Sequence, residues 1–221
     1  MKTNFLVVSI LSLWFASCTG NQQNSSNDKG NLNSDSADTV TKKDDFNNEN
    51  AEIRNDTALR ALGDSILRLL KNRNYAGLTQ SIDPNSGLRF SPYGIVDTVK
   101  NKTLSASQII ELAKNKKTIK WGIFEGTGEP IELTIDDYFK RFVYDVDFIG
   151  AEKKSINKII GQDSSLSNIK AVYPDGEFVQ YYFSGFKKQY EGMDWKSLVL
   201  VFKRADKKTF LVSIIHNQWK I

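Results

Sequence analysis

The last 45 residues restrict the fold more than any other part of the chain, because they read as three consecutive β-strands. The three runs are EFVQYYFSG, WKSLVLVFK and TFLVSIIHNQWKI, separated by FKKQYEGMD and RADKK. Such runs of β-branched and aromatic residues, bounded by turn-forming residues, are typical of strands. The second and third runs are apolar on both faces, which indicates central strands. The short RADKK link favours an antiparallel hairpin between them.

Helical patterns precede these strands. Apolar residues recur at helical spacing from Leu59 to Leu70, with Asn55 or Asp56 expected as the N-cap. Two later helices are predicted from capping-box patterns, Ser105 with Gln108 and Thr134 with Asp137. Helices first and meandering strands last predict a single α+β globular domain over residues 51–221. Its N-terminal helices are expected to pack on a curved antiparallel sheet in a cone-like arrangement.

The glycine-rich stretch KWGIFEGTGEPIELT, residues 120–134, raises the possibility of a phosphate-binding loop. Such a loop needs Lys and Ser or Thr directly after its last glycine, at the start of a helix. Here Glu129 and Pro130 follow Gly128. The Glu129 carboxylate would repel a phosphate, and Pro130 has no backbone N–H to donate to it. The stretch therefore predicts a turn between two strands, with the glycines supplying positive φ.

The chain begins with a short apolar run, Phe5 to Ala16, preceded by Lys2. At about a dozen residues the run is shorter than the ~20 that a membrane-spanning helix needs, which indicates a signal peptide. Phe15-Ala16-Ser17-Cys18 resembles a bacterial lipobox, which implies a lipoprotein signal peptide over residues 1–17 and an acylated Cys18. The alternative is an ordinary secretory signal. Cys18 is the only cysteine, so its acylation would exclude disulfides, cysteine-ligated zinc and cysteine nucleophiles.

Residues 18–50 are rich in Asn, Ser, Asp and Gln, and they are predicted to form a disordered tether. No acidic run directly follows Cys18, which favours an outer-membrane anchor facing the periplasm over the cell surface. From residue 51 onward the chain holds 26 basic and 20 acidic residues. The lysines are scattered and accompany no nucleic-acid motif, so no nucleic acid is expected as a partner. The expected partners are the lipid bilayer, through acylated Cys18, and an envelope protein or a small ligand.

His216 is the only histidine and the first catalytic candidate. A single histidine acts as a general base when a carboxylate orients it. Asp194 is the second candidate, and Asp136, Asp145 and Glu125 are further possible partners. We expect His216 on the strand face that carries Phe210, Val212 and Ile214. The alternative is a buried structural histidine. No spacing of ligands resembles a metal site, and no cofactor is predicted.

Aromatic residues are the second set of candidates. Trp121, Tyr144, Trp195 and Trp219 are predicted ligand-binding residues if they line one cleft for a sugar or a peptide. The alternative is that they form part of the core, as aromatic residues in strands usually do.

Four segments carry a resemblance to known proteins: SGLRFSPYG, WGIFEGTGEPIELTIDDYFKRFVYDVDF, GMDWKSLVLVF and VSIIHNQWKI. The chain from about residue 60 resembles a family of bacterial envelope lipoproteins with no assigned activity, which implies lipidation and an envelope location. The order of elements is also similar to the nuclear-transport-factor-2-like cone, an analogy of fold alone.

Together these features predict a membrane-anchored lipoprotein of the bacterial envelope whose domain binds a ligand or a protein without catalysis. One alternative is a hydrolase or isomerase that uses His216 with a nearby carboxylate. A further alternative is a sugar- or peptidoglycan-binding module. The oligomeric state stays open.

Overall fold

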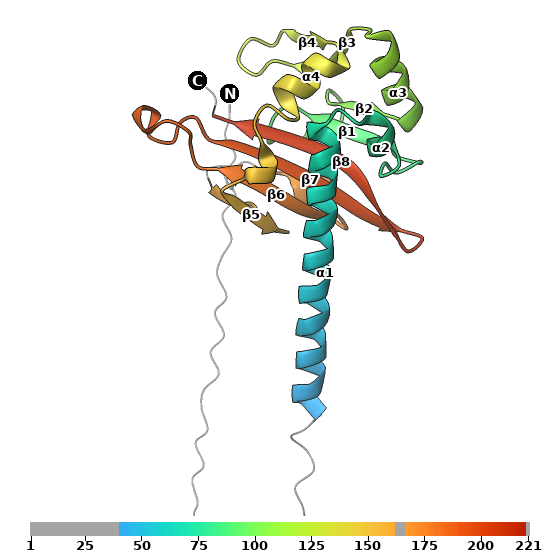
Figure 1. The fold of residues 1–221 in the computed structure, drawn as a ribbon, viewed down its shortest axis with the longest axis vertical. Coiled ribbons are helices and arrows are strands. Elements are labelled where there is room, and N and C mark those ends of the chain that lie inside the picture. The colour runs from blue at the N-terminus through green and yellow to red at the C-terminus, as the bar shows by residue number, and fades with distance from the viewer. Residues whose placement is uncertain (1–39, 162–166, 220–221) are drawn as a thin grey trace, which may run out of the picture. The chain divides into compact units, whose positions relative to one another are not determined.

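The computed structural model describes residues 40–161 and 167–219 (Figure 1). The chain divides into two units, residues 1–42 and residues 43–221. The domain described below is the second unit. The predicted signal peptide, Cys18 and the tether up to residue 39 lie outside the described residues.

The domain contains helices and strands in the following order. They are α1 (Val40–Lys71), α2 (Tyr75–Thr79), β1 (Leu88–Ser91), β2 (Lys102–Leu104), α3 (Ala106–Asn115), β3 (Ile119–Ile123), β4 (Pro130–Leu133), α4 (Ile135–Phe142), the 3-10 helix η1 (Phe148–Gly150), β5 (Lys153–Ile156), α5 (Ile169–Val172), β6 (Glu177–Phe183), the 3-10 helix η3 (Lys188–Tyr190), β7 (Lys196–Ala205) and β8 (Lys208–Gln218).

Six strands form one large curved sheet in the order β2-β1-β8-β7-β6-β5. β7 and β8 lie in its interior, as their apolar patterns predict, and their hairpin closes through Asp206 and Lys207, both at positive φ. The expectation of a fully antiparallel sheet is wrong for one pairing, because β1 runs parallel to β8, with Arg89 opposite Ser213. β1 is not joined to β8 by a hairpin, so no tight turn sets its direction. The fold is α+β with a mixed sheet.

The predicted turn at Gly126 and Gly128 and the predicted cap at Ser105 are confirmed, and the predicted box at Thr134 is confirmed in one of its two hydrogen bonds. β3 and β4 form a separate two-stranded sheet, and Gly126 and Gly128 both take positive φ in the turn that joins them. Ser105 and Gln108 make both hydrogen bonds of a capping box at the start of α3. The Thr134 side chain accepts a hydrogen bond from the Asp137 amide at the start of α4.

Helix α1 begins at Val40, earlier than the expected domain start at residue 51. The expected N-cap at Asn55 or Asp56 is wrong, because both residues lie inside the helix. Asn55 instead donates a side-chain hydrogen bond of 2.8 Å to Glu177 at the start of β6. Asn is common at helix ends, but Asn55 instead makes a contact with a residue far away in the sequence. Local sequence does not reveal such a contact.

One face of the large sheet is covered by α1 and α4, as Figure 1 shows for α1 crossing β6 and β7. The approach is closest at Gly63, where a Cβ would lie 2.4 Å from the Tyr181 hydroxyl oxygen. The same hydroxyl donates to Asp64 at 3.1 Å. The opposite face packs against α5 through a smaller cluster that includes Phe178, Val199 and Ile169. Both faces of the central strands are therefore buried.

A register shift between β7 and β8 changes which residues of β8 share a face. Val201 pairs with Ser213, but Phe202 pairs with Leu211, so one extra residue of β8 stands opposite this step. As a result Leu211 and Ile214 belong to the helix-covered core, whereas Val212 belongs to the opposite cluster. The expectation that His216 shares a face with Val212 is wrong for this reason.

Candidate functional site

His216 lies with Asp145 and Lys196 on the helix-covered side of the sheet. β8 carries His216 opposite Leu198 of β7, and Lys196 stands two residues before Leu198 on the same face. Asp145 comes from the loop between α4 and η1. Its Oδ2 atom lies 3.3 Å from Nε2 of His216 and accepts a hydrogen bond from the Lys196 ammonium. One carboxylate thus faces two basic side chains.

This cluster is closed to solvent on its histidine side. His216 is fully buried, the Asp145 side chain is 9% exposed and Lys196 is 23% exposed. Burial by itself would raise the pKa of the Asp145 carboxyl, but contacts with His216 and Lys196 outweigh it and hold the pKa below its ordinary value. Neither ring nitrogen of His216 has a hydrogen-bond partner among the described residues, so the 3.3 Å contact is a close approach rather than a directed hydrogen bond.

Aromatic side chains fill the space next to the histidine. The Phe142 ring stands edge-on to His216 with 6.1 Å between centroids, and Tyr138 lies 5.3 Å from Phe142. Tyr138 in turn stacks on Trp121 at 4.0 Å with an interplanar angle of 13°. All four side chains are buried. This packing gives the interior the character of a core rather than of a substrate cavity.

The other predicted carboxylates lie in different environments. Asp194 accepts hydrogen bonds of 2.9 and 3.0 Å from the amides of Phe186 and Lys187, and it thereby organises the connection between β6 and β7. Asp136 accepts from the Tyr75 hydroxyl and from Lys116, both at 2.5 Å. The carboxylate beside His216 is Asp145, which the sequence offered only as one of several possibilities.

The four predicted ligand-binding aromatics are not gathered in one open cleft. Trp121 is buried and donates its indole N–H to the Leu133 carbonyl at 2.9 Å. Trp195 is buried, and Tyr144 is half-buried with its hydroxyl donating to Asp147 at 2.6 Å. Trp219 is 43% exposed. The arrangement therefore does not provide two exposed rings for stacking on a sugar.

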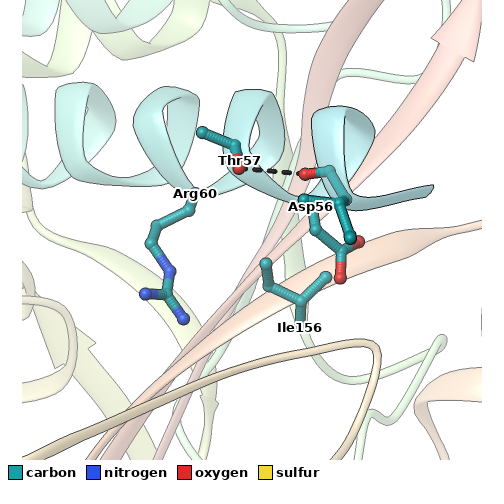
Figure 2. Close-up of a pocket in the computed structure, with 5 residues that line it drawn as sticks. Asp56, Thr57, Arg60 and Ile156 are labelled. Atoms are coloured by element: carbon teal, nitrogen blue, oxygen red, sulfur yellow. Dashed lines mark hydrogen bonds between the residues drawn. The ribbon is translucent and has the colours of Figure 1, made fainter. Parts of the chain in front are cut away.

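An open groove lies elsewhere, between α1 and β5 (Figure 2). Its volume is about 350 Å³, and its lining residues are Ile53, Asp56, Thr57, Arg60 and Ile156. Figure 2 shows the Arg60 guanidinium and the Asp56 carboxylate on either side of Ile156. Among the described residues, neither charged side chain has an ion-pair or hydrogen-bond partner. Within the described part of the chain, the groove therefore combines apolar surface with two opposite charges that are not paired with each other or with a third group.

Sequence reasoning missed this groove. Its α1 residues stand at positions i, i+3, i+4 and i+7, which is the spacing of one helix face. These α1 residues include one apolar, one hydroxyl and two charged side chains, so they do not produce the apolar repeat by which a helix face is recognised. It also lies where the chain was expected to enter the domain rather than to line a site.

Metal-binding groups and membrane-spanning helices also bear on function. Across residues 40–161 and 167–219, no group of three or more His, Cys, Asp or Glu side chains is arranged to hold a metal ion. No helix in that same part of the chain has both the length and the apolar character that crossing a membrane requires.

Comparisons with known proteins give limited similarity. No protein-family model matches the chain, and no curated protein matches it. A protein from Xanthomonas campestris, provisionally named as a calcium/calmodulin dependent protein kinase II association domain, is similar in structure. It has 12% sequence identity and a TM-score of 0.32 over 73% of this chain and 85% of that chain. A five-substitution variant named Rd1NTF2_05 has 13% identity and a TM-score of 0.29 over 74% and 98%. At these scores the cone and the lipoprotein family stay predictions.

Proposed function

We propose that the domain is a non-catalytic binding module, held at the bacterial envelope by an acylated Cys18, with the α1–β5 groove as its binding site. The observation that carries this proposal is the pair of opposite charges, Asp56 and Arg60, on the walls of an open groove of about 350 Å³, with no ion-pair or hydrogen-bond partner for either among the described residues. Binding sites typically combine apolar lining with a few polar groups that orient the ligand. The proposed location is the outer membrane, facing the periplasm.

The lining indicates the class of ligand. A guanidinium presents a fork of N–H donors that matches a carboxylate, and Asp56 offers oxygens to an ammonium group. Ile53 and Ile156 provide apolar contact beside them. We therefore propose small zwitterions with an apolar side chain, such as free amino acids or short peptides.

A thermal-shift screen tests this proposal. A panel of apolar amino acids and dipeptides is added to the wild-type protein, to Arg60→Gln and to Arg68→Gln, which removes an exposed arginine of the same helix outside the groove. A ligand at 100 times its Kd stabilises by about 2.7 kcal/mol, which corresponds to a rise in Tm of roughly 5–10 °C. We expect the rise in the wild type and Arg68→Gln, and its loss in Arg60→Gln. An equal rise in all three proteins would place binding outside the groove.

The alternative of a hydrolase or isomerase keeps one supporting observation, the 3.3 Å approach of Asp145 to His216. In that function Asp145 would orient the imidazole and His216 would act as general base. Complete burial of His216 argues against it. Chromatography of the same protein–ligand mixtures separates the two functions, because an enzyme converts the ligand into new products and a binding module leaves it unchanged. The sugar-binding alternative has less support, since of the four candidate aromatics only Trp219, at 43%, is exposed.

A further inference from the structure

Exposed apolar side chains are concentrated on the β6–β7 loop, which we define as Ser184–Trp195. Phe186 is 47% exposed, Tyr190 39% and Met193 45%. Trp219, also largely exposed, is joined to the base of the loop by a hydrogen bond from its amide to the Trp195 carbonyl. Figure 1 shows the loop in orange, projecting past the end of β6 and β7. Of the three aromatic side chains that are exposed among the described residues, Phe186 and Tyr190 thus lie on this loop and Trp219 is bonded to its base.

Internal hydrogen bonds hold the loop in this conformation. Both oxygens of Asp194 accept from backbone amides of the opposite limb, those of Phe186 and Lys187. The Met193 amide donates to the Tyr190 carbonyl at 2.7 Å, and the Tyr190 amide donates to Lys187 at 3.0 Å. An ordered loop that keeps three large apolar side chains in water indicates a surface with a binding role.

Basic side chains accompany the apolar ones. The Lys187 ammonium lies 5.4 Å from the Tyr190 ring centroid, and Lys188 adjoins it in a hollow of about 240 Å³. Two nearby acidic side chains are already engaged: Asp194 bonds the loop amides, and Glu152 accepts from Ser184 at 2.6 Å. Glu191 and Asp194 are the acidic residues within the loop, and Lys187 and Lys188 are its basic residues. Aromatic, Met and Lys side chains on one loop are suited to the polar–apolar boundary of a bilayer.

We propose that the β6–β7 loop is a second membrane contact, which inserts Phe186, Tyr190 and Met193 into the headgroup region of an anionic phospholipid surface. The inference rests on the anchor in the proposed function. The 21 residues between Cys18 and Val40 reach at most about 75 Å when fully extended, so an acylated chain keeps the domain near the bilayer. Because the anchor holds the domain close to the bilayer, even a weak contact between the loop and the lipid surface can form.

The size of the patch favours a lipid surface over a second copy of the chain. A buried aromatic side chain contributes about 150–250 Å², and these residues are already roughly half covered. Their remaining surface falls well below the roughly 800 Å² per partner that stable protein interfaces bury. A bilayer needs no such matched area, because insertion of a few side chains adds to the anchor already present.

The test places a single fluorescent probe on the loop of the full-length acylated protein. Cys18 is the only cysteine and is blocked when acylated, so Met193→Cys gives one reactive thiol. Val99→Cys is the matched control, because Val99 is 91% exposed and lies between β1 and β2. Both proteins carry an environment-sensitive dye and are reconstituted in vesicles of equimolar phosphatidylcholine and phosphatidylglycerol. We expect a blue shift and nitroxide-lipid quenching for the Met193 position only.

The lysines are tested in the same vesicles. Each basic side chain near an anionic surface changes the ratio of inserted to free loop by roughly fivefold. Lys187→Gln with Lys188→Gln is therefore expected to reduce insertion by more than tenfold. The matched pair Lys207→Gln with Lys208→Gln, at the β7–β8 turn, leaves insertion unchanged.

Each remaining outcome overturns the proposal. A dye at position 193 that stays as water-exposed as the dye at position 99, in vesicle-bound protein, excludes the contact. A blue shift without quenching by nitroxide lipid indicates a protein surface instead. Labelling of Cys18 itself shows that the anchor is absent, and then the anchor of the proposed function and the loop contact fail together. The first two outcomes leave the anchor intact.

Discussion

The segment that follows α4 holds two aspartates, Asp145 and Asp147, with similar partners and different surroundings. Asp145 accepts from Lys196 of β7, and their side chains are 9% and 23% exposed. Asp147 accepts from Lys71 at the end of α1 at 2.7 Å, and their side chains are 56% and 47% exposed. The chain thus makes the same aspartate–lysine pair twice within three residues, once inside the domain and once in water.

Burial decides what each pair contributes. An exposed pair typically contributes about 0–1 kcal/mol, because water already solvates both charges. Removing one member of a buried pair costs about 3–5 kcal/mol, because the other charge is left without a partner. The close carboxylate of His216 therefore has a structural explanation, the neutralisation of Lys196, whose side chain is only 23% exposed. A histidine beside an aspartate does not by itself indicate catalysis.

The largest effect on stability is expected when each aspartate–lysine pair is broken separately. Asp145→Ala should lower the free energy of unfolding by about 3–5 kcal/mol, and Asp147→Ala by no more than about 1 kcal/mol. Chemical denaturation of both variants measures the difference. Equal losses would show that water reaches Asp145 and that the interior is more open than its burial indicates.

A combined replacement separates lost charge balance from lost packing. Asp145→Ala together with Lys196→Met and His216→Leu replaces every polar side chain of the cluster by an apolar one. Replacing a whole buried ionic group by apolar side chains is often neutral. We expect this triple variant to recover most of the stability lost in Asp145→Ala. If the triple variant is even less stable than Asp145→Ala, the loss of stability comes from side-chain packing rather than from an unbalanced charge.

The sequence predicted those features that depend on neighbouring residues. The β7–β8 hairpin follows from two apolar runs and a short link, and the turn at Gly126 and Gly128 follows from glycine chemistry. Features that depend on distant residues were missed. The parallel pairing of β1 with β8 joins residues more than 120 positions apart, such as Arg89 and Ser213. No local pattern encodes that contact.

The site shows the same limit. His216 was recognised from its type, but the sequence left its partner open among Asp194, Asp136, Asp145 and Glu125. In the structure Asp194 serves the β6–β7 loop and Asp145 reaches the histidine. A loop carries Asp145, so its position depends on how α4 packs on the sheet. The shift in register before Ser213 then sets the face of His216, and a one-residue bulge leaves no clear mark in the sequence.

A smaller effect should appear at low pH. The pKa of the Asp145 carboxyl is lower in the folded state than its ordinary value near 4, so the unfolded chain takes up a proton first as the pH falls. Stability from this group is present above pH about 4 and is lost as the pH falls through the folded pKa. Unfolding free energies between about pH 2 and 6 should fall less steeply for Asp145→Asn than for the wild type. If the unfolding free energies of the wild type and Asp145→Asn fall equally with pH, the pKa of Asp145 is not lowered in the folded state.

The smallest expected effect concerns salt and the exposed pair. Lys71→Met removes the partner of Asp147 and should cost at most about 1 kcal/mol at low ionic strength. At about 1 M salt the screening length falls to about 3 Å, so this cost should shrink to a few tenths of a kcal/mol. Lys196→Met, matched in chemistry, should keep most of its cost because salt ions do not reach a buried pair. If salt reduces both costs alike, solvent ions reach Asp145, and the contrast between the two aspartates disappears.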